Sequence, residues 1–136
     1  MLADAQKVME LLVQGTDVAR AYAVAHGMTS QHHARAITQR VSRPATGTYE
    51  LDAIRIGGMA FVTAPYEMFS SSGRYIKDNS PIDMTMVFSC SNMYGAYFPT
   101  RAAFEYGCYE SWTAYYAPGC AEATAEKFVE MLTSIA

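Results

Sequence analysis

A carboxylate and a group of phenols are the side chains in this sequence whose positions favour chemistry. Glu67 comes directly after a short apolar run that ends at Pro65, where a predicted strand gives way to a predicted helix. Functional sites in layered α/β domains gather at such strand-to-helix turns. A carboxylate is also stabilising near a helix N-terminus, so Glu67 by itself fits a structural role as well as a functional one.

A second group follows the next predicted strand along the chain. Asn92, Tyr94 and Tyr97 belong to an aromatic loop, and Tyr109 with Glu110 forms a further aromatic and acidic pair. The loop is expected at the exit of its strand, and therefore beside the exit of the strand before Glu67. Tyrosines three residues apart in a loop are more often packing groups with a satisfied hydroxyl than catalysts, so both interpretations stay open on the pattern alone.

These residues resemble two motifs of the neutral and alkaline (non-lysosomal) ceramidases and their bacterial relatives. The first motif of that family reads P-G-E-F-T-T-M-(A/S)-G-R, and the residues here in the same register are Pro65, Glu67, Ser72, Gly73 and Arg74. The second reads N-x-Y-x-x-Y-x-x-T-x-x-x-Y-x-x-x-x-Y-E, and its gap-free counterparts are Asn92, Tyr94, Tyr97, Thr100, Phe104, Tyr109 and Glu110. Phe104 stands where the family has a tyrosine. The resemblance covers residues 50–135 and none of residues 1–45.

The resemblance implies a zinc-dependent amidase of sphingolipid metabolism, which hydrolyses the N-acyl bond of ceramide. It implies that Glu67 and Tyr97 are zinc ligands. The implied neighbours of that site are Tyr94, Asn92, Arg74, Tyr109 and Glu110. Zinc in such a site polarises the amide carbonyl and activates a nucleophile or water. In the family two histidines and a serine complete the site from an upstream region with no counterpart here, so no catalytic residue is assigned in this chain.

The chain departs from the family pattern at several points. Tyr66 replaces the glycine beside the acid and is expected to put a bulky ring where the family keeps space. His32 and His33 match no family motif, and adjacent side chains point apart on a helix or strand, so they do not replace the missing ligands. A carboxylate and a phenol alone are a weak set for zinc. We therefore expect zinc in a full-length parent, none in this chain, and no activity from the isolated chain.

Two other hypotheses remain beside the enzymatic one. The chain could be a non-enzymatic binding or scaffold domain with a tyrosine-rich surface, because the tyrosine ring is apolar and its tip polar. That surface would consist of Tyr94, Tyr97, Tyr109, Tyr115 and Tyr116. A homo-oligomer is the third hypothesis, since pairing would cover an exposed sheet edge and apolar surface. Convergence of Glu67 and Tyr97 would favour the enzymatic hypothesis, and separation of the two would oppose it.

Composition limits the other classes of protein. The chain has 136 residues, 51% of them hydrophobic, and a formal net charge of −3. The mild acidity argues against nucleic-acid binding, and no apolar run reaches the ~18 residues of a transmembrane helix.

Three cysteines without a C-x-x-C pair are expected to be small buried residues. The start of the chain lacks a signal-peptide pattern, although the resemblance implies a secreted or periplasmic parent with a lipid or amide substrate.

The predicted elements indicate an α/β fold of the layered α+β kind. Helices are expected over residues 3–26 with an interruption at Gly15, 68–77, 101–107 and 121–135, and strands over 48–56, 59–64 and 84–89. The first two strands are expected to form a β-hairpin that turns at Gly57-Gly58. Residues 29–40 fit a short helix or an extended connection, and residues 92–99 and 109–118 fit loops. This order predicts a small mixed sheet of about three or more strands with helices packed on it. We expect one domain over residues 1–136, the C-terminal part of a larger ceramidase-like protein, with a helical segment 1–45 and a motif-bearing segment 46–136.

Overall fold

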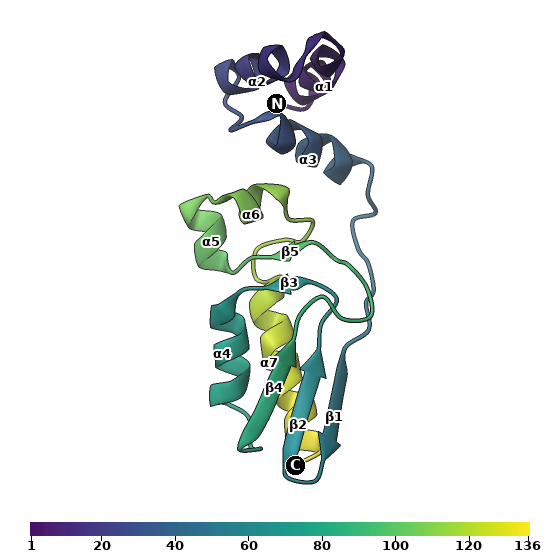
Figure 1. The fold of residues 1–136 in the computed structure, drawn as a ribbon, viewed down its shortest axis with the longest axis vertical. Coiled ribbons are helices and arrows are strands. Elements are labelled where there is room, and N and C mark those ends of the chain that lie inside the picture. Colours follow the sequence, from purple (N-terminus) through teal and green to yellow (C-terminus); the bar gives the residue numbers. More distant parts are fainter. The chain divides into compact units, whose positions relative to one another are not determined.

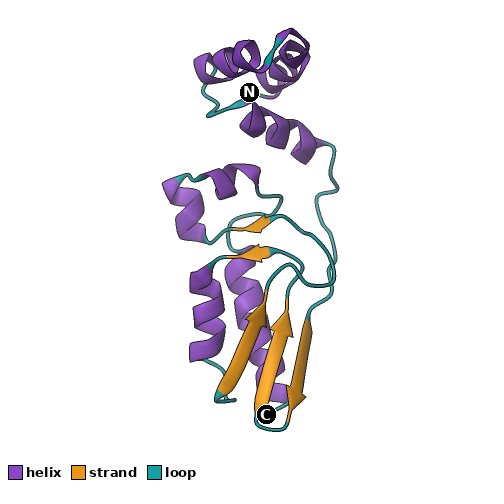
Figure 2. Ribbon diagram, viewed as in Figure 1, coloured by secondary structure: helices purple, strands orange, loops and turns teal.

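The computed structural model describes all residues from Met1 to Ala136 and divides them into two compact units. The first unit is Met1–Gly47 and the second is Thr48–Ala136. The first unit consists of helices, whereas the second combines helices with strands (Figures 1 and 2). None of the helices is both long and apolar enough to span a bilayer.

The first unit is a small helical bundle with a core of mostly small residues. Its elements are α1 (Leu2–Leu11), the 3₁₀-helix η1 (Leu12–Gln14), α2 (Thr16–Ala25) and α3 (Gln31–Val41). Gly15 separates η1 from α2 with a φ of 129°, which confirms the predicted interruption. The segment that fitted either a helix or an extended connection is helical, and the Ser30 side chain caps it by accepting from the backbone N–H of His33. The buried core residues are Ala5, Val8, Ala19, Ala23, Met28 and Ala34.

The second unit carries all the residues of the two ceramidase-like motifs. Its strands are β1 (Asp52–Ile56), β2 (Met59–Thr63), β3 (Glu67–Met68), β4 (Met84–Phe88) and β5 (Tyr97–Phe98). Its helices are α4 (Ser70–Asp78), α5 (Arg101–Tyr106), α6 (Tyr109–Thr113) and α7 (Cys120–Ser134). The predicted class is confirmed, because a small mixed sheet of three strands has helices packed against it.

The main sheet has the strand order β1-β2-β4. β1 and β2 form the predicted antiparallel hairpin, and β2 pairs in parallel with β4 after a crossover through α4. Alternate residues of a strand point to opposite faces, and Ala60 and Val62 of β2 point to the face covered by α7 (Figure 2). There they join Ile76 of α4 and Phe128 and Leu132 of α7 in a fully buried core.

The structure differs from the predicted elements around the motifs. The helix expected from Met68 begins only at Ser70, because Glu67 and Met68 pair with Tyr97 and Phe98 as a second, two-stranded sheet. Residues 92–99 therefore include a strand. Tyr109–Thr113 is helical where a loop was expected, and its N-terminus is closed by a reciprocal capping arrangement of Cys108 and Ser111. A strand of two residues and a helix of five residues are too short to show their hydrophobic periods.

Candidate functional site

Glu67 and Tyr97 are directly opposite each other in the parallel pair formed by β3 and β5. Paired residues of neighbouring strands project to the same face of a sheet. The backbone N–H of Glu67 also donates to the carbonyl oxygen of Ala96 over 3.0 Å, which fixes the register of the pair. Two residues 30 positions apart in the sequence, which the resemblance assigns to one site, thus share one face of this two-stranded sheet.

Tyr94 completes a carboxylate–phenol cluster with Glu67 and Tyr97. The Tyr94 hydroxyl donates to Oε1 of Glu67 over 3.0 Å, although the Tyr94 side chain is 69% exposed. This hydrogen bond is the main reason why the pKa of Tyr94 lies above its ordinary value. The pKa of Tyr97 is raised first by burial and then by the charge of Glu67. Both phenols are therefore protonated donors at neutral pH.

Tyr109 and Glu110 border the same cluster from α6. The rings of Tyr97 and Tyr109 meet edge to face, with centroids 5.9 Å apart. Glu110 is close enough for its charge to add to the rise in the pKa of Tyr97. The structure thus brings together Glu67, Tyr94, Tyr97, Tyr109 and Glu110.

Asn92 and Arg74 do not contact this cluster. Asn92 donates through Nδ2 to Oδ2 of Asp52 over 2.6 Å, and the hydroxyl of Thr63 donates to the same oxygen over 2.7 Å. Asn92 therefore ties the β4–β5 loop to the start of β1. Arg74 is exposed on α4, lines shallow surface pockets, one of them with Lys77, and forms neither a hydrogen bond nor an ion pair with Glu67. Sequence reasoning missed Asp52, whose partner lies 40 residues away.

Tyr66 lies in the core rather than beside the carboxylate. The expectation that its ring fills space next to Glu67 is wrong, because the side chain is fully buried and stacks on Phe98 with centroids 3.9 Å apart and planes 10° apart. Tyr49 and Tyr116 meet this stack edge to face. Burial raises the pKa of the Tyr66 phenol. Tyr116, expected on a tyrosine-rich surface, packs against the same core.

The loop between β4 and β5 is tightly held against the segment that precedes Glu67. The backbone N–H of Gly95 donates to the carbonyl oxygen of Pro65, and a Cβ at Gly95 would lie only 2.8 Å from that oxygen. Three residues other than glycine adopt a positive φ here: Cys90 at 54°, Asn92 at 68° and Ala96 at 61°. Such backbone is costly and persists only where the surroundings determine it. These constraints hold β5 in register with β3.

Glu67 and Tyr97 offer a carboxylate and a phenol oxygen, two atom types that zinc can bind. Zinc sites use three or four protein ligands. No three side chains of the histidine, cysteine, aspartate and glutamate types come together in a group that could hold a metal ion.

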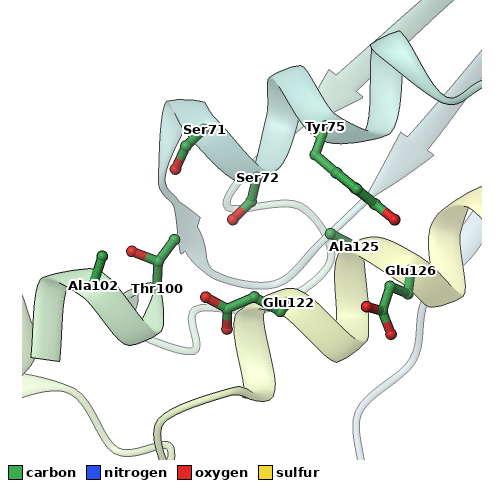
Figure 3. Close-up of a pocket in the computed structure, with 8 residues that line it drawn as sticks. All are labelled: Ser71, Ser72, Tyr75, Thr100, Ala102, Glu122, Ala125 and Glu126. Carbon is green, nitrogen blue, oxygen red and sulfur yellow. The ribbon is translucent and has the colours of Figure 1, made fainter.

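A separate pocket of about 340 Å³ lies between α4, α5 and α7 (Figure 3). Two of its polar side chains bond to the first turn of α5: Oε1 of Glu122 accepts from the backbone N–H of Arg101 over 2.8 Å, and Thr100 accepts from the backbone N–H of Ala103 over 3.3 Å. Both bonds satisfy N–H groups at the start of a helix. None of the residues that line the pocket belongs to the Glu67 cluster. Thr100 and Glu122, which cap α5, make up part of its polar lining.

The second unit is thus an α+β unit with a carboxylate–phenol cluster at a parallel strand pair. No family model matches the chain, and no curated protein matches it either. Among solved structures the chain is similar to one described as a ceramidase complexed with C2, with 26% sequence identity and a TM-score of 0.53. The match covers 61% of this chain and 14% of that ceramidase chain. The similarity supports a ceramidase-like fold over that part of the chain.

Proposed function

We propose that this chain contributes Glu67 and Tyr97 to a zinc-dependent amide hydrolase site of the ceramidase type, whose remaining ligands come from outside the chain. The register pairing of Glu67 with Tyr97 is the observation that carries the proposal. The similarity to a solved ceramidase supports it. Zinc, when bound, would supply Lewis-acid polarisation of an amide carbonyl. On this proposal the isolated chain is inactive toward N-acyl amides.

The residues around Glu67 would prepare its carboxylate for such a role. Tyr94 holds Oε1 by a hydrogen bond, which fixes the orientation of the carboxylate and leaves Oε2 outside that bond. Tyr97, whose raised pKa keeps it protonated, would have to lose its proton to act as a ligand. Metal affinity should therefore rise with pH.

The test is a zinc titration of the full chain with added imidazole, which replaces the nitrogen ligands absent from the cluster. Two-dimensional NMR reads the backbone amides of Glu67 and Tyr97. We expect weak binding with shifts centred on these amides, and a loss of affinity of roughly tenfold or more in Glu67→Gln and in Tyr97→Phe.

Matched controls for this titration are Glu105→Gln and Tyr106→Phe, since both side chains are exposed on α5. They should leave the zinc response unchanged. Equal affinity in the wild type, Glu67→Gln and Tyr97→Phe would contradict the proposal.

A binding module is the second candidate function, and the exposure of three tyrosines favours it. Tyr94, Tyr106 and Tyr109 are 69%, 88% and 50% exposed. Exposed tyrosines combine apolar area with a polar tip, as recognition surfaces do. This candidate predicts no zinc-dependent shift at Glu67 or Tyr97, so the same titration separates the two functions.

A further inference from the structure

One whole face of the three-stranded sheet is apolar and has no covering layer within the second unit. Seven large side chains form this open face: Ile54, Ile56, Met59, Phe61, Met84, Met86 and Phe88. The strand register aligns them in rows, with Ile56, Met59 and Met84 in one row and Ile54, Phe61 and Met86 in the next. Figure 2 shows α7 behind the sheet and no element of the second unit in front of it.

The exposure of the open face is unusual for a sheet with one solvated side. Ile56 is 61% exposed and Met84 is 54% exposed, and Ile54, Met59 and Phe88 range from 37% to 46%. A sheet that packs on one side normally presents polar residues on the other. Contiguous apolar surface of this kind marks an interaction site.

The charge on the open face limits what could cover it. Its rows contain no lysine, arginine or glutamate, and Asp52 at one end is engaged by Thr63 and Asn92. A lipid surface is commonly bound with the help of basic residues near the headgroups, and this face has none. Asp52 is the one charged residue in the rows of this face, so two copies can meet over the rows of Ile56 and Ile54 without repulsion between like charges.

We propose that a second copy of this chain covers the open face and forms a symmetric dimer by sheet-on-sheet packing. The two faces would be equivalent, as in other two-fold interfaces, and packed sheets lie ~10 Å apart with side chains interdigitated. An aromatic side chain buries roughly 150–250 Å², and isoleucine and methionine bury less. Five half-exposed side chains therefore bury at most on the order of 500 Å² per copy and 1,000 Å² in total, which is the size of a weak, concentration-dependent interface. This inference does not depend on zinc or on Glu67.

The first measurement is sedimentation equilibrium of the full chain over a wide concentration range. We expect the mass to rise from 15.0 kDa toward twice that value as concentration increases. Methionine-methyl NMR across the same range locates the contact. The methyl signals of Met59, Met84 and Met86 should shift with concentration, whereas that of Met131, which packs on the core from α7, should stay in place.

Two substitutions then test the face itself. Ile56→Lys and Met84→Lys place a charge at exposed positions of β1 and β4, and each should weaken dimerisation roughly tenfold or more. Val13→Lys is the matched control, because Val13 is 92% exposed in η1 and lies off the sheet. Circular dichroism verifies that each variant is folded. If one lysine variant does not fold, the other still tests the face.

Two outcomes would overturn the dimer. The first is a monomer at every concentration. If the Met59, Met84 and Met86 methyl signals of that monomer shift on addition of neutral phosphatidylcholine vesicles, a lipid surface is the occupant. The second is a dimer that both lysine variants retain while folded.

Discussion

The two faces of the β3–β5 pair use the same residue types for different purposes. On one face Tyr66 and Phe98 stack in the core, with Tyr49 and Tyr116 packed edge to face around them. On the other face Tyr94 and Tyr97 flank the carboxylate of Glu67 and Tyr109 packs on Tyr97, and Tyr94 and Tyr109 are 69% and 50% exposed. Each tyrosine takes its role from its surroundings.

The pKa values of two phenols, Tyr66 on the buried face and Tyr94 on the other, are raised by different main causes. Tyr66 and Tyr94 both have a pKa above the ordinary value. Burial is the main cause for Tyr66, because an ionised phenol loses its hydration there. The hydrogen bond to Glu67 is the main cause for Tyr94. The buried face stabilises the fold by packing, and the other face arranges proton donors around one acid.

Among substitutions on the two faces, removal of the Phe98 ring should cause the largest loss in the free energy of unfolding. Phe98→Ala deletes one side of the stack with Tyr66 in a fully buried site. We expect the free energy of unfolding to fall by about 3–5 kcal/mol. Denaturant titration followed by the fluorescence of Trp112 reports on the second unit, since Trp112 is the single tryptophan.

The control for the Phe98 prediction is Tyr106→Ala, which removes an 88% exposed ring. Its effect on the unfolding free energy should stay within about 0.5 kcal/mol. A loss below about 1 kcal/mol in Phe98→Ala would show that the stack is not an essential part of the core.

Gly95 lies in the loop before β5 and packs closely against Pro65 and Tyr116. Its substitution should lower the free energy of unfolding by an intermediate amount. A Cβ at this position meets the carbonyl oxygen of Pro65 and the hydroxyl of Tyr116, each at 2.8 Å. Gly95→Ala should therefore lower the unfolding free energy by about 1–3 kcal/mol. Gly58→Ala is the matched control, because nothing lies within 4 Å of its Cβ. An equal response of the two variants, measured by denaturant titration, would exclude the close approach at Gly95.

The sequence predicted the elements that have a clear period or a strong turn signal. The hairpin has a strong turn signal at Gly57-Gly58 between its two strands, and the long helix α7 has helical spacing over 15 residues. The pairing of Glu67–Met68 with Tyr97–Phe98 was not predicted. A two-residue strand is created by its partner rather than by its own pattern, and 30 residues separate the two.

The site was predictable only in part for the same physical reason. The two motifs follow two predicted strands, so Glu67 and Tyr97 were expected to lie near each other. Their pairing agrees with that expected position. The bond of Asn92 to Asp52 had no local signal. Tyr66, by contrast, had one: neighbouring side chains in extended chain point to opposite faces, so a residue next to an outward Glu67 faces inward.

The smallest and most specific effect concerns the titration of the phenols in Glu67→Ala. Alanine removes both the hydrogen-bond acceptor of Tyr94 and the negative charge that favours the neutral phenol. The pKa of Tyr94 should therefore fall toward its ordinary value, and that of Tyr97 should fall less, because burial is its first cause.

Tyr66 serves as the internal control for that titration, since burial in the core raises its pKa and the substitution does not change that burial. Tyrosine ring-carbon NMR over the alkaline range, with Trp112 fluorescence to verify folding, measures the individual phenols. If the pKa of Tyr97 fell more than that of Tyr94, the Glu67 charge would act mainly on its strand partner, and the hydrogen bond of Tyr94 would not be what organises this face. A larger fall for Tyr94 than for Tyr97 follows from the hydrogen bond of Tyr94 to Glu67, and an unchanged Tyr66 follows only if the two faces are electrostatically separate.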